Sequence, residues 1–243
     1  MRRSIPLFLA VALPLAAGCI PYSTGTTAAP IPPGVLEPSL AVYFVPGGLD
    51  PTGGDSTAGS LIGADAEIRY GIDERSDVGV RAPGLVGIVV DYKRRLDGGS
   101  TREEPALAAL VGGGVVNAGE HALFQAALLA SGGQSNRLTP YGGAKLMQVI
   151  PLTSYAVEDK PTIGVFGGVR LGSERLGISP EVGVFYDPSA LGLRERNWIV
   201  VPSFTFHGQE VLDVLLGGSR RGRDDPYPPR PTPVPRPPGG RWP

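Results

Sequence analysis

The strictest constraint on this chain is an alternation of charged and apolar residues with a period of two. Within residues 61–70, Asp65, Glu67 and Arg69 occupy every second position, and apolar residues lie between them. Successive side chains of a β-strand point to opposite faces, so this segment predicts a strand with one charged and one apolar face. A helix would scatter these charges around its axis.

The same period recurs along most of the chain, and helical periodicity is nearly absent. Ten strands are predicted, near residues 39–46, 61–70, 76–82, 86–95, 106–115, 121–131, 139–150, 161–171, 177–187 and 197–206. Antiparallel strands joined by short turns fit a meander that closes on itself and so removes its edges. The predicted fold class is all-β: an antiparallel up-and-down meander β-barrel of about ten strands, with eight as the alternative count.

One region also fits a helix. In residues 117–133, Asn117 is a candidate N-cap, Glu120 completes a capping box and Gly132 is a candidate C-cap. We predict a strand over 121–131, because a helix there would break the count of ten.

The first residues predict export. Arg2 and Arg3 precede a short apolar stretch that ends in small residues, as in a secretory signal peptide. Leu-Ala-Ala-Gly at 15–18 precedes Cys19, the only cysteine of the chain, and this run resembles the bacterial lipobox. The resemblance implies covalent diacylglycerol and acyl chains on Cys19 as the new N-terminus. Because Ile20 rather than Asp follows, it also implies the outer membrane.

Composition divides the rest of the chain. We expect a signal peptide at 1–18, a lipidated Pro/Thr/Ala-rich extended tether at 19–38, a β-barrel at 39–207, and a short apolar patch with a disordered tail at 208–243. Residues 219–243 hold nine Pro and six Arg, which favours polyproline II and not a packed core. This tail is either a basic arm for the cell wall or a periplasmic protein, or a solubilising extension.

Charge excludes one class of function. Residues 19–218 carry 14 basic and 21 acidic groups, a net charge of −7, so a nucleic-acid-binding core is not expected.

Alternation alone does not say which face of the barrel is inside, so a membrane barrel and a soluble barrel both remain open. The charged set is nearly neutral in sum and could close on itself inside a narrow barrel. We therefore predict a barrel-interior charge network of Asp65, Glu67, Arg69, Asp77, Arg81, Asp91, Lys93, Arg95, Lys145, Arg170 and Glu181. Aromatic residues near strand ends predict a membrane-facing girdle of Tyr70, Tyr92, Tyr141, Tyr186, Trp198 and Phe206.

Several segments resemble small bacterial outer-membrane β-barrel proteins. The Tyr-Gly-turn-Asp-x-Gly-x-Arg hairpin at 70–81, the strand at 90–93 and the segment at 139–145 carry the resemblance, and residues 200–206 resemble the terminal strand by which such barrels are assembled. The resemblance covers about residues 30–206 and implies an architecture without a chemistry.

Candidate chemistry is sparse. His121 and His207 have no Glu or Cys at ligand spacing, so we expect no metal site. Ser131 or Ser203 could approach a histidine across strands, but solvated strand-end histidines are the default expectation. We therefore expect no catalytic, metal-binding or cofactor-binding residues. The only bound groups expected are the covalent diacylglycerol and acyl chains on Cys19.

The sequence thus predicts a lipid-anchored outer-membrane β-barrel with an occluded polar interior and a structural or interaction role. The alternatives are a lipid-tethered soluble lipocalin-like barrel for a small hydrophobic ligand and, less favoured, an outer-membrane lipase or acyl transferase. Expected partners are outer-membrane lipid and, through the tail, the cell wall or a periplasmic protein, with no nucleic acid and a monomeric state. An even strand number predicts that both termini are periplasmic.

Overall fold

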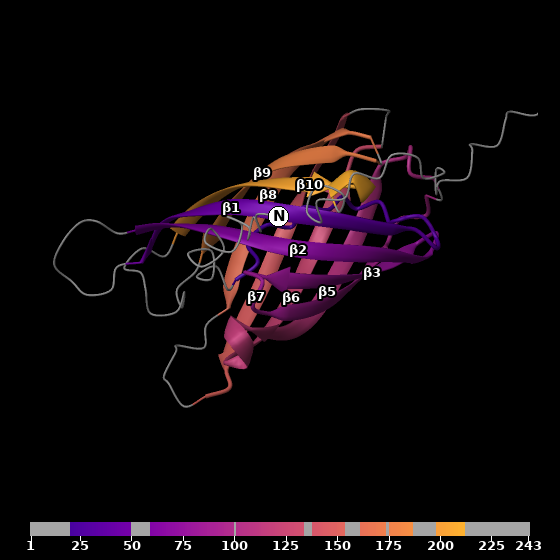
Figure 1. The fold of residues 1–243 in the computed structure, drawn as a ribbon. Coiled ribbons are helices and arrows are strands. Elements are labelled where there is room, and N and C mark those ends of the chain that lie inside the picture. The colour runs from indigo at the N-terminus through magenta and orange to yellow at the C-terminus, as the bar shows by residue number, and fades with distance from the viewer. Residues whose placement is uncertain are drawn as a thin grey trace, which may run out of the picture.

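The computed structural model describes residues 20–49, 59–99, 101–133, 138–153, 161–173, 175–186 and 198–211. Ten antiparallel strands form a closed barrel (Figure 1). The strands are β1 Leu36–Leu49, β2 Gly59–Asp73, β3 Ser76–Pro83, β4 Ile88–Arg95, β5 Ala106–Val116, β6 His121–Ser131, β7 Leu138–Pro151, β8 Thr162–Gly172, β9 Gly177–Tyr186 and β10 Trp198–His207. The predicted all-β meander of ten strands is confirmed.

Each strand pairs with its neighbours in sequence, and β1 pairs with β10 to close the barrel. In the closing pair Ser39 lies opposite His207, and Tyr43 lies opposite Ser203. Because both edges of the meander are used, the strands in the described part of the chain leave no open edge for another chain to extend.

The helix alternative for residues 117–133 is wrong. A 3-10 turn, η2 (Asn117–Gly119), precedes β6, in which inward and outward residues alternate. Asn117 and Ala118 both have positive φ, which reverses the chain between β5 and β6. The side chain of Asn117 does donate to Glu120, at 2.7 Å, but this bond stabilises the reversal and caps no helix.

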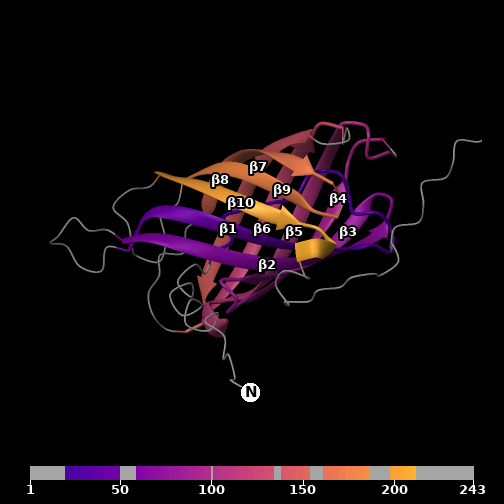
Figure 2. The ribbon, with the colours of Figure 1, turned by 45° about the horizontal axis from the view of Figure 1, so that its top comes forward.

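The barrel has two ends, which we call the near mouth and the far mouth. The near mouth is where β1 begins at Leu36 and β10 ends at His207. The far mouth is the opposite end, where β9 ends at Tyr186 and β10 begins at Trp198. Figure 2 shows β10 running beside β1 toward the near mouth.

The outward face of the strands is apolar. Ile68, Val80, Val182 and Phe204, all in the middle of strands, are 47–51% exposed. Among the strand side chains that the structure describes, the exposed charged residues are Asp73 and Arg94, both at the near mouth. The inward positions, which alternate with the outward apolar residues, carry the charges. The lumen is therefore polar and the outer surface of the wall is apolar.

Apolar clusters fill two parts of the lumen. Toward the far mouth, Tyr43, Val89, Leu123, Phe185 and Ile199 pack together. Glycines make room for the largest of these rings, because a Cβ at Gly63 would collide with Tyr43 and one at Gly164 or Gly183 with Phe185. A second cluster, including Leu110, Leu129 and Phe166, lies on the β5–β8 wall.

Candidate functional site in the barrel lumen

The lumen holds the chain's own N-terminal segment. Residues 20–31, here called the luminal segment, are all buried. The segment begins with Ile20 in the far-mouth apolar cluster, and it ends with Ile31, which binds Asp77 of β3. Pro33 then bridges Gly71 of β2, and the chain turns into β1 at the near mouth.

This finding corrects the expected tether over 19–38, because residues 20–31 lie inside the barrel and not along its outside. The Pro/Thr/Ala composition that suggested a linker also suits a narrow lumen, because it brings no charge and little bulk. Leu36 and His207 both lie at the near mouth, as an even strand number requires, but the luminal segment adds one more crossing and places Ile20 toward the far mouth. The prediction that both termini are periplasmic rested on the strand number alone and did not include this crossing. Cys19 itself, the signal peptide and the tail beyond residue 211 lie outside the described residues.

Buried cations bind the backbone of the luminal segment. Three of them donate to its carbonyl groups: Lys145 to Pro21 (2.5 Å), Arg81 to Ser23 (2.7 Å) and Thr24 (3.1 Å), and Lys93 to Thr27 (3.0 Å) and Ala29 (3.3 Å). Charge-assisted bonds of this kind are stronger than neutral ones. The segment is therefore held along its length by opposite walls of the barrel.

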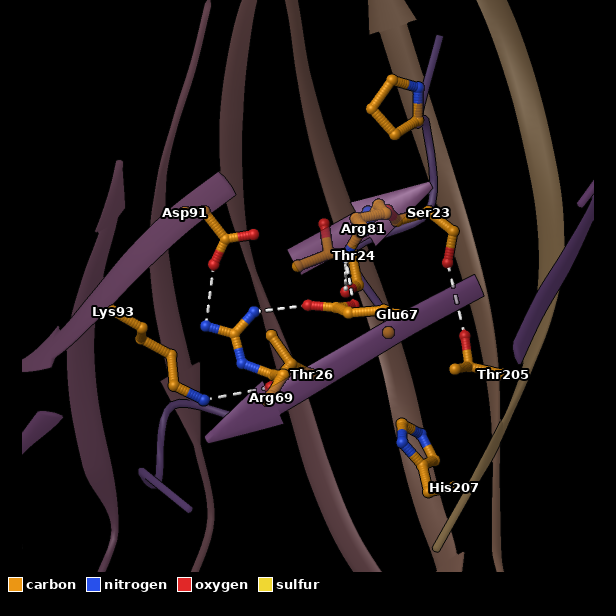
Figure 3. Close-up of polar contacts among 12 residues, drawn as sticks. Ser23, Thr24, Thr26, Glu67, Arg69, Arg81, Asp91, Lys93, Thr205 and His207 are labelled. Atoms are coloured by element: carbon orange, nitrogen blue, oxygen red, sulfur yellow. Dashed lines mark hydrogen bonds and ion pairs between the residues drawn. The ribbon is translucent and has the colours of Figure 1, made fainter. Parts of the chain in front are cut away.

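Buried anions bind its N–H groups. Glu181 of β9 accepts from the N–H groups of Thr24 and Gly25 at 2.8 and 3.0 Å, and Asp77 accepts from Ile31 at 2.9 Å. Figure 3 shows Ser23, Thr24 and Thr26 among the lumen side chains, with Ser23 facing Thr205 and Thr26 facing Lys93.

The lumen charges also bind one another. Arg69 is the centre of this network, with ion pairs to Glu67 (2.5 Å), Asp77 (2.6 Å) and Asp91 (2.8 Å). Glu67 also pairs with Arg81 at 2.7 Å. Because Arg81, Lys93 and Asp77 serve both the network and the luminal segment, wall and segment form one polar system.

The structure places all eleven residues of the predicted interior network on the inward face. Ten are buried, and the side chain of Arg170 is 10% exposed at the near mouth. Arg170 pairs with Glu37 through two bonds of 3.0 and 2.8 Å, a partner that the sequence had not singled out.

Arg95 is buried, but it organises a loop. It binds the carboxylate of Asp97 and the carbonyl groups of Thr101 and Pro105 in the β4–β5 connection. The hydrogen bond from Arg95, with further bonds from the N–H groups of Leu107 and Gly99, holds the pKa of Asp97 well below its usual range.

One member of the predicted aromatic girdle is wrong. Tyr141 is buried in the lumen and donates to Glu181 at 3.0 Å. It shares its parity with Lys145, so it must share the inward face. The other five face outward: Tyr70, Tyr92 and Phe206 toward the near mouth, and Tyr186 and Trp198, whose ring centroids lie 5.3 Å apart, at the far mouth.

The histidines lie at opposite mouths. His121 is near Asn117 at the far mouth, while Ser203 binds Ser23 and Ser131 lies at the other end of β6. His207 instead contacts the hydroxyl of Ser179, with Nε2 2.8 Å from Oγ.

Ser179, His207 and Glu37 are the residue types of a hydrolytic triad (nucleophile, base and carboxylate), but their geometry does not fit one. His207 Nδ1 is 3.7 Å from Glu37 Oε1, longer than a hydrogen bond, and Arg170 engages both oxygens of that carboxylate. Ser179 is only 1% exposed. These residues form a buried polar network at the near mouth.

Within the described ranges, no group of three or more His, Cys, Asp or Glu side chains is arranged to hold a metal ion. The same residues include no helix that is both long and apolar enough to span a membrane.

Comparison with known proteins gives structural neighbours only. No protein family model matches the chain, and no curated protein matches its sequence. A designed transmembrane β-barrel has a TM-score of 0.32 at 14% identity, over 73% of this chain and 98% of its own. Neisserial surface protein A (NspA) has a TM-score of 0.32 at 14% identity, over 71% and 94%. OprG of Pseudomonas aeruginosa has a TM-score of 0.31 at 14% identity, over 75% and 99%.

Proposed function

We propose that this protein is a lipid-anchored outer-membrane β-barrel whose lumen is occluded by its own N-terminal segment, with a structural or interaction role and no enzymatic activity. One observation carries the proposal: the apolar residues face outward and the charged residues face inward. Ile68 and Val80 are exposed beside the buried Arg69 and Arg81. A water-soluble barrel would have the opposite arrangement, because exposed apolar patches of this extent are rare on soluble monomers.

The aromatic residues support a membrane-spanning height. Trp198 and Phe206 mark the two ends of the outward face of β10. Their eight-residue separation corresponds to roughly 27 Å along a strand, or about 20 Å across a membrane at a strand tilt of about 40°. That height approaches the apolar band of about 25 Å in known outer-membrane barrels.

The filled lumen argues against the soluble alternative and against a wide pore. A lipocalin-like barrel needs an apolar cavity for its ligand, whereas here the buried Arg81 and Lys93 bind the luminal segment. The contacts of the segment with opposite walls support occlusion.

The anchor in this proposal is Cys19, next to Ile20. Because Ile20 lies toward the far mouth, the acyl chains would join the leaflet at that mouth. The tail, which follows β10, would leave from the near mouth. Three acyl chains at Cys19 would reinforce an attachment that the barrel already provides.

The test of membrane insertion is Cys19→Ala, exported with a cleavable signal peptide. We expect the variant to remain in the outer-membrane fraction and to run differently in boiled and unboiled gel samples, because the strands themselves span the bilayer. Release as a folded soluble protein would refute the proposed membrane barrel. Metabolic labelling with a fatty-acid analogue tests the anchor separately, with label expected on the wild-type chain and lost from Cys19→Ala.

The sidedness is tested with single cysteines in the Cys19→Ala background. Glu74→Cys lies in the β2–β3 turn at the near mouth, and Leu85→Cys lies in the β3–β4 turn at the far mouth, both exposed. A membrane-impermeant maleimide on intact cells should label one of them and spare the other. Labelling of both or neither would contradict a spanning barrel with two separated mouths.

A further inference from the structure

The lumen binds the luminal segment mainly through its backbone. Lumen side chains contact the carbonyl groups of Ile20, Pro21, Ser23, Thr24, Thr27 and Ala29 and the N–H groups of Thr24, Gly25 and Ile31. Main-chain contacts of this kind recognise an extended polypeptide without reading its side chains. The residues of the segment are also uncharged, so they compete with none of the lumen's ion pairs.

Space sets what the lumen accepts. At Gly25 the backbone has φ of +60°, and an added Cβ would lie 2.6 Å from Thr205 Oγ1. Ala28 and Ala29 are fully buried in the second apolar cluster. Apolar anchors lie at the ends of the segment, where the ring of Tyr22 packs 5.2 Å from that of Phe185. The lumen thus fits small residues in the middle and larger ones toward its far mouth.

Water can replace the polar contacts that hold the segment. Among the described residues, the segment and its continuation to Val35 pair with the wall as a strand only at the Pro33–Gly71 bridge. Most of the remaining polar contacts are hydrogen bonds to charged side chains, and these side chains would be hydrated in a water-filled lumen, where acidic and basic groups are interspersed.

We propose that the lumen is a binding site for an extended, uncharged polypeptide, that residues 20–31 are its tethered ligand, and that the barrel without this segment is a water-filled channel. The inference rests on the proposed membrane barrel. The segment then acts as an intramolecular competitor for any peptide of the same chemistry that enters the lumen.

The experiment compares the full chain with a variant that lacks residues 20–31, both reconstituted in planar bilayers. We expect the full chain to remain closed and the deletion variant to conduct steadily. A synthetic peptide with the sequence of residues 20–31 should block this conductance. The same peptide carrying Gly25→Val should not, because its added side chain meets Thr205. An inserted but non-conducting deletion variant, or equal block by both peptides, would overturn the proposal.

A second form of the test uses the intact fold and does not need the deletion variant to fold. A protease site inserted between the exposed Gly34 and the half-buried Val35 allows cleavage of the folded protein at the near mouth. We expect a fluorescent 20–31 peptide to replace the cleaved segment, and the Gly25→Val peptide to fail. No exchange by either peptide would overturn the peptide site. Failure of the uncleaved chain to insert into bilayers would instead refute the proposed membrane barrel.

Discussion

Replacing Arg69 with methionine tests whether the interior charges act as one network. The Arg69 side chain is 3% exposed and forms ion pairs with three carboxylates, those of Glu67, Asp77 and Asp91. Methionine keeps much of the length of the side chain and removes its charge and all of its donors. The three carboxylates then stay buried with part of their compensation lost.

The expected destabilisation follows from this loss. Removing one partner from a buried ion pair destabilises a protein by about 3–5 kcal/mol, because the other charge is left uncompensated. With a urea dependence of about 2 kcal/mol per molar, the unfolding midpoint should fall by about 2 M. Adding Asp91→Asn should restore about 1–3 kcal/mol of this loss, because one uncompensated carboxylate becomes neutral.

The assay is urea unfolding in detergent micelles, followed by the mobility of unboiled samples on a denaturing gel. Arg94→Met is the matched control, because Arg94 is an exposed arginine on β4 and should change stability by no more than about 0.5 kcal/mol. If Arg69→Met and Arg94→Met lower the midpoint equally, or if Asp91→Asn worsens the Arg69 variant, the reasoning is refuted.

Three further predictions use the same unfolding assay or limited proteolysis. Val80→Arg, on the outward face of β3, should lower the free energy of unfolding in lipid vesicles by about 2–4 kcal/mol. Leu85→Arg, in the adjoining turn, is the control and should lower it by less than about 1 kcal/mol. Equal effects of the two substitutions would argue against lipid contact at Val80. Phe185→Ala should cost about 3–5 kcal/mol by leaving a far-mouth cavity, and a loss below 1 kcal/mol would contradict that packing. Because the pKa of Asp97 is lowered in the folded protein, its carboxylate stays ionised as pH falls to about 4. The β4–β5 loop should therefore stay resistant to protease down to that pH and lose its resistance only below it, where the carboxylate becomes protonated. Asp97→Asn should lose this resistance already at neutral pH.

The barrel could be predicted from sequence because its two faces differ in charge. At 65, 67 and 69 the alternating residues fix the parity of a whole strand, and one parity error would place a charge on the apolar outer face. The wrong assignment of Tyr141 to the girdle shows that parity is the rule to follow. Its position near a strand end suggested the girdle, whereas its parity with Lys145 assigns it to the lumen, where it binds Glu181.

The luminal segment could not be predicted in this way. Its residues have no charge and no clear period, and its partners, such as Lys93 and Glu181, bind backbone groups that every residue possesses. Such contacts leave no signature in side-chain identity. Composition therefore indicated a linker, and only the folded lumen shows what that linker occupies. Glu37 was missed for a related reason, because its partner Arg170 is 133 residues away.

The crossing of the lumen also constrains assembly. The luminal segment continues into β1 at the near mouth, while Ile20 at its other end lies toward the far mouth. A group attached N-terminal to Ile20 must therefore either pass through the closed barrel or already lie at the far mouth before β1 pairs with β10. The lumen is already filled by buried side chains, including Arg81 and Lys145, so a bulky group could not pass. We therefore expect the barrel to close around the segment.

Refolding with a large group on Cys19 tests this order. Streptavidin is bound to biotin-maleimide on Cys19 of the unfolded chain, which is then refolded into detergent micelles. If the barrel closes around the segment, the labelled chain should reach the folded form, whose gel mobility changes on boiling. After cleavage at the near mouth, its segment should exchange with the 20–31 peptide no faster than that of the unlabelled chain. Threading after closure would instead leave the labelled chain with an empty lumen and immediate peptide binding. A cysteine placed at the end of the chain in the Cys19→Ala background controls for the bulk of streptavidin, since it need not cross the lumen in either order.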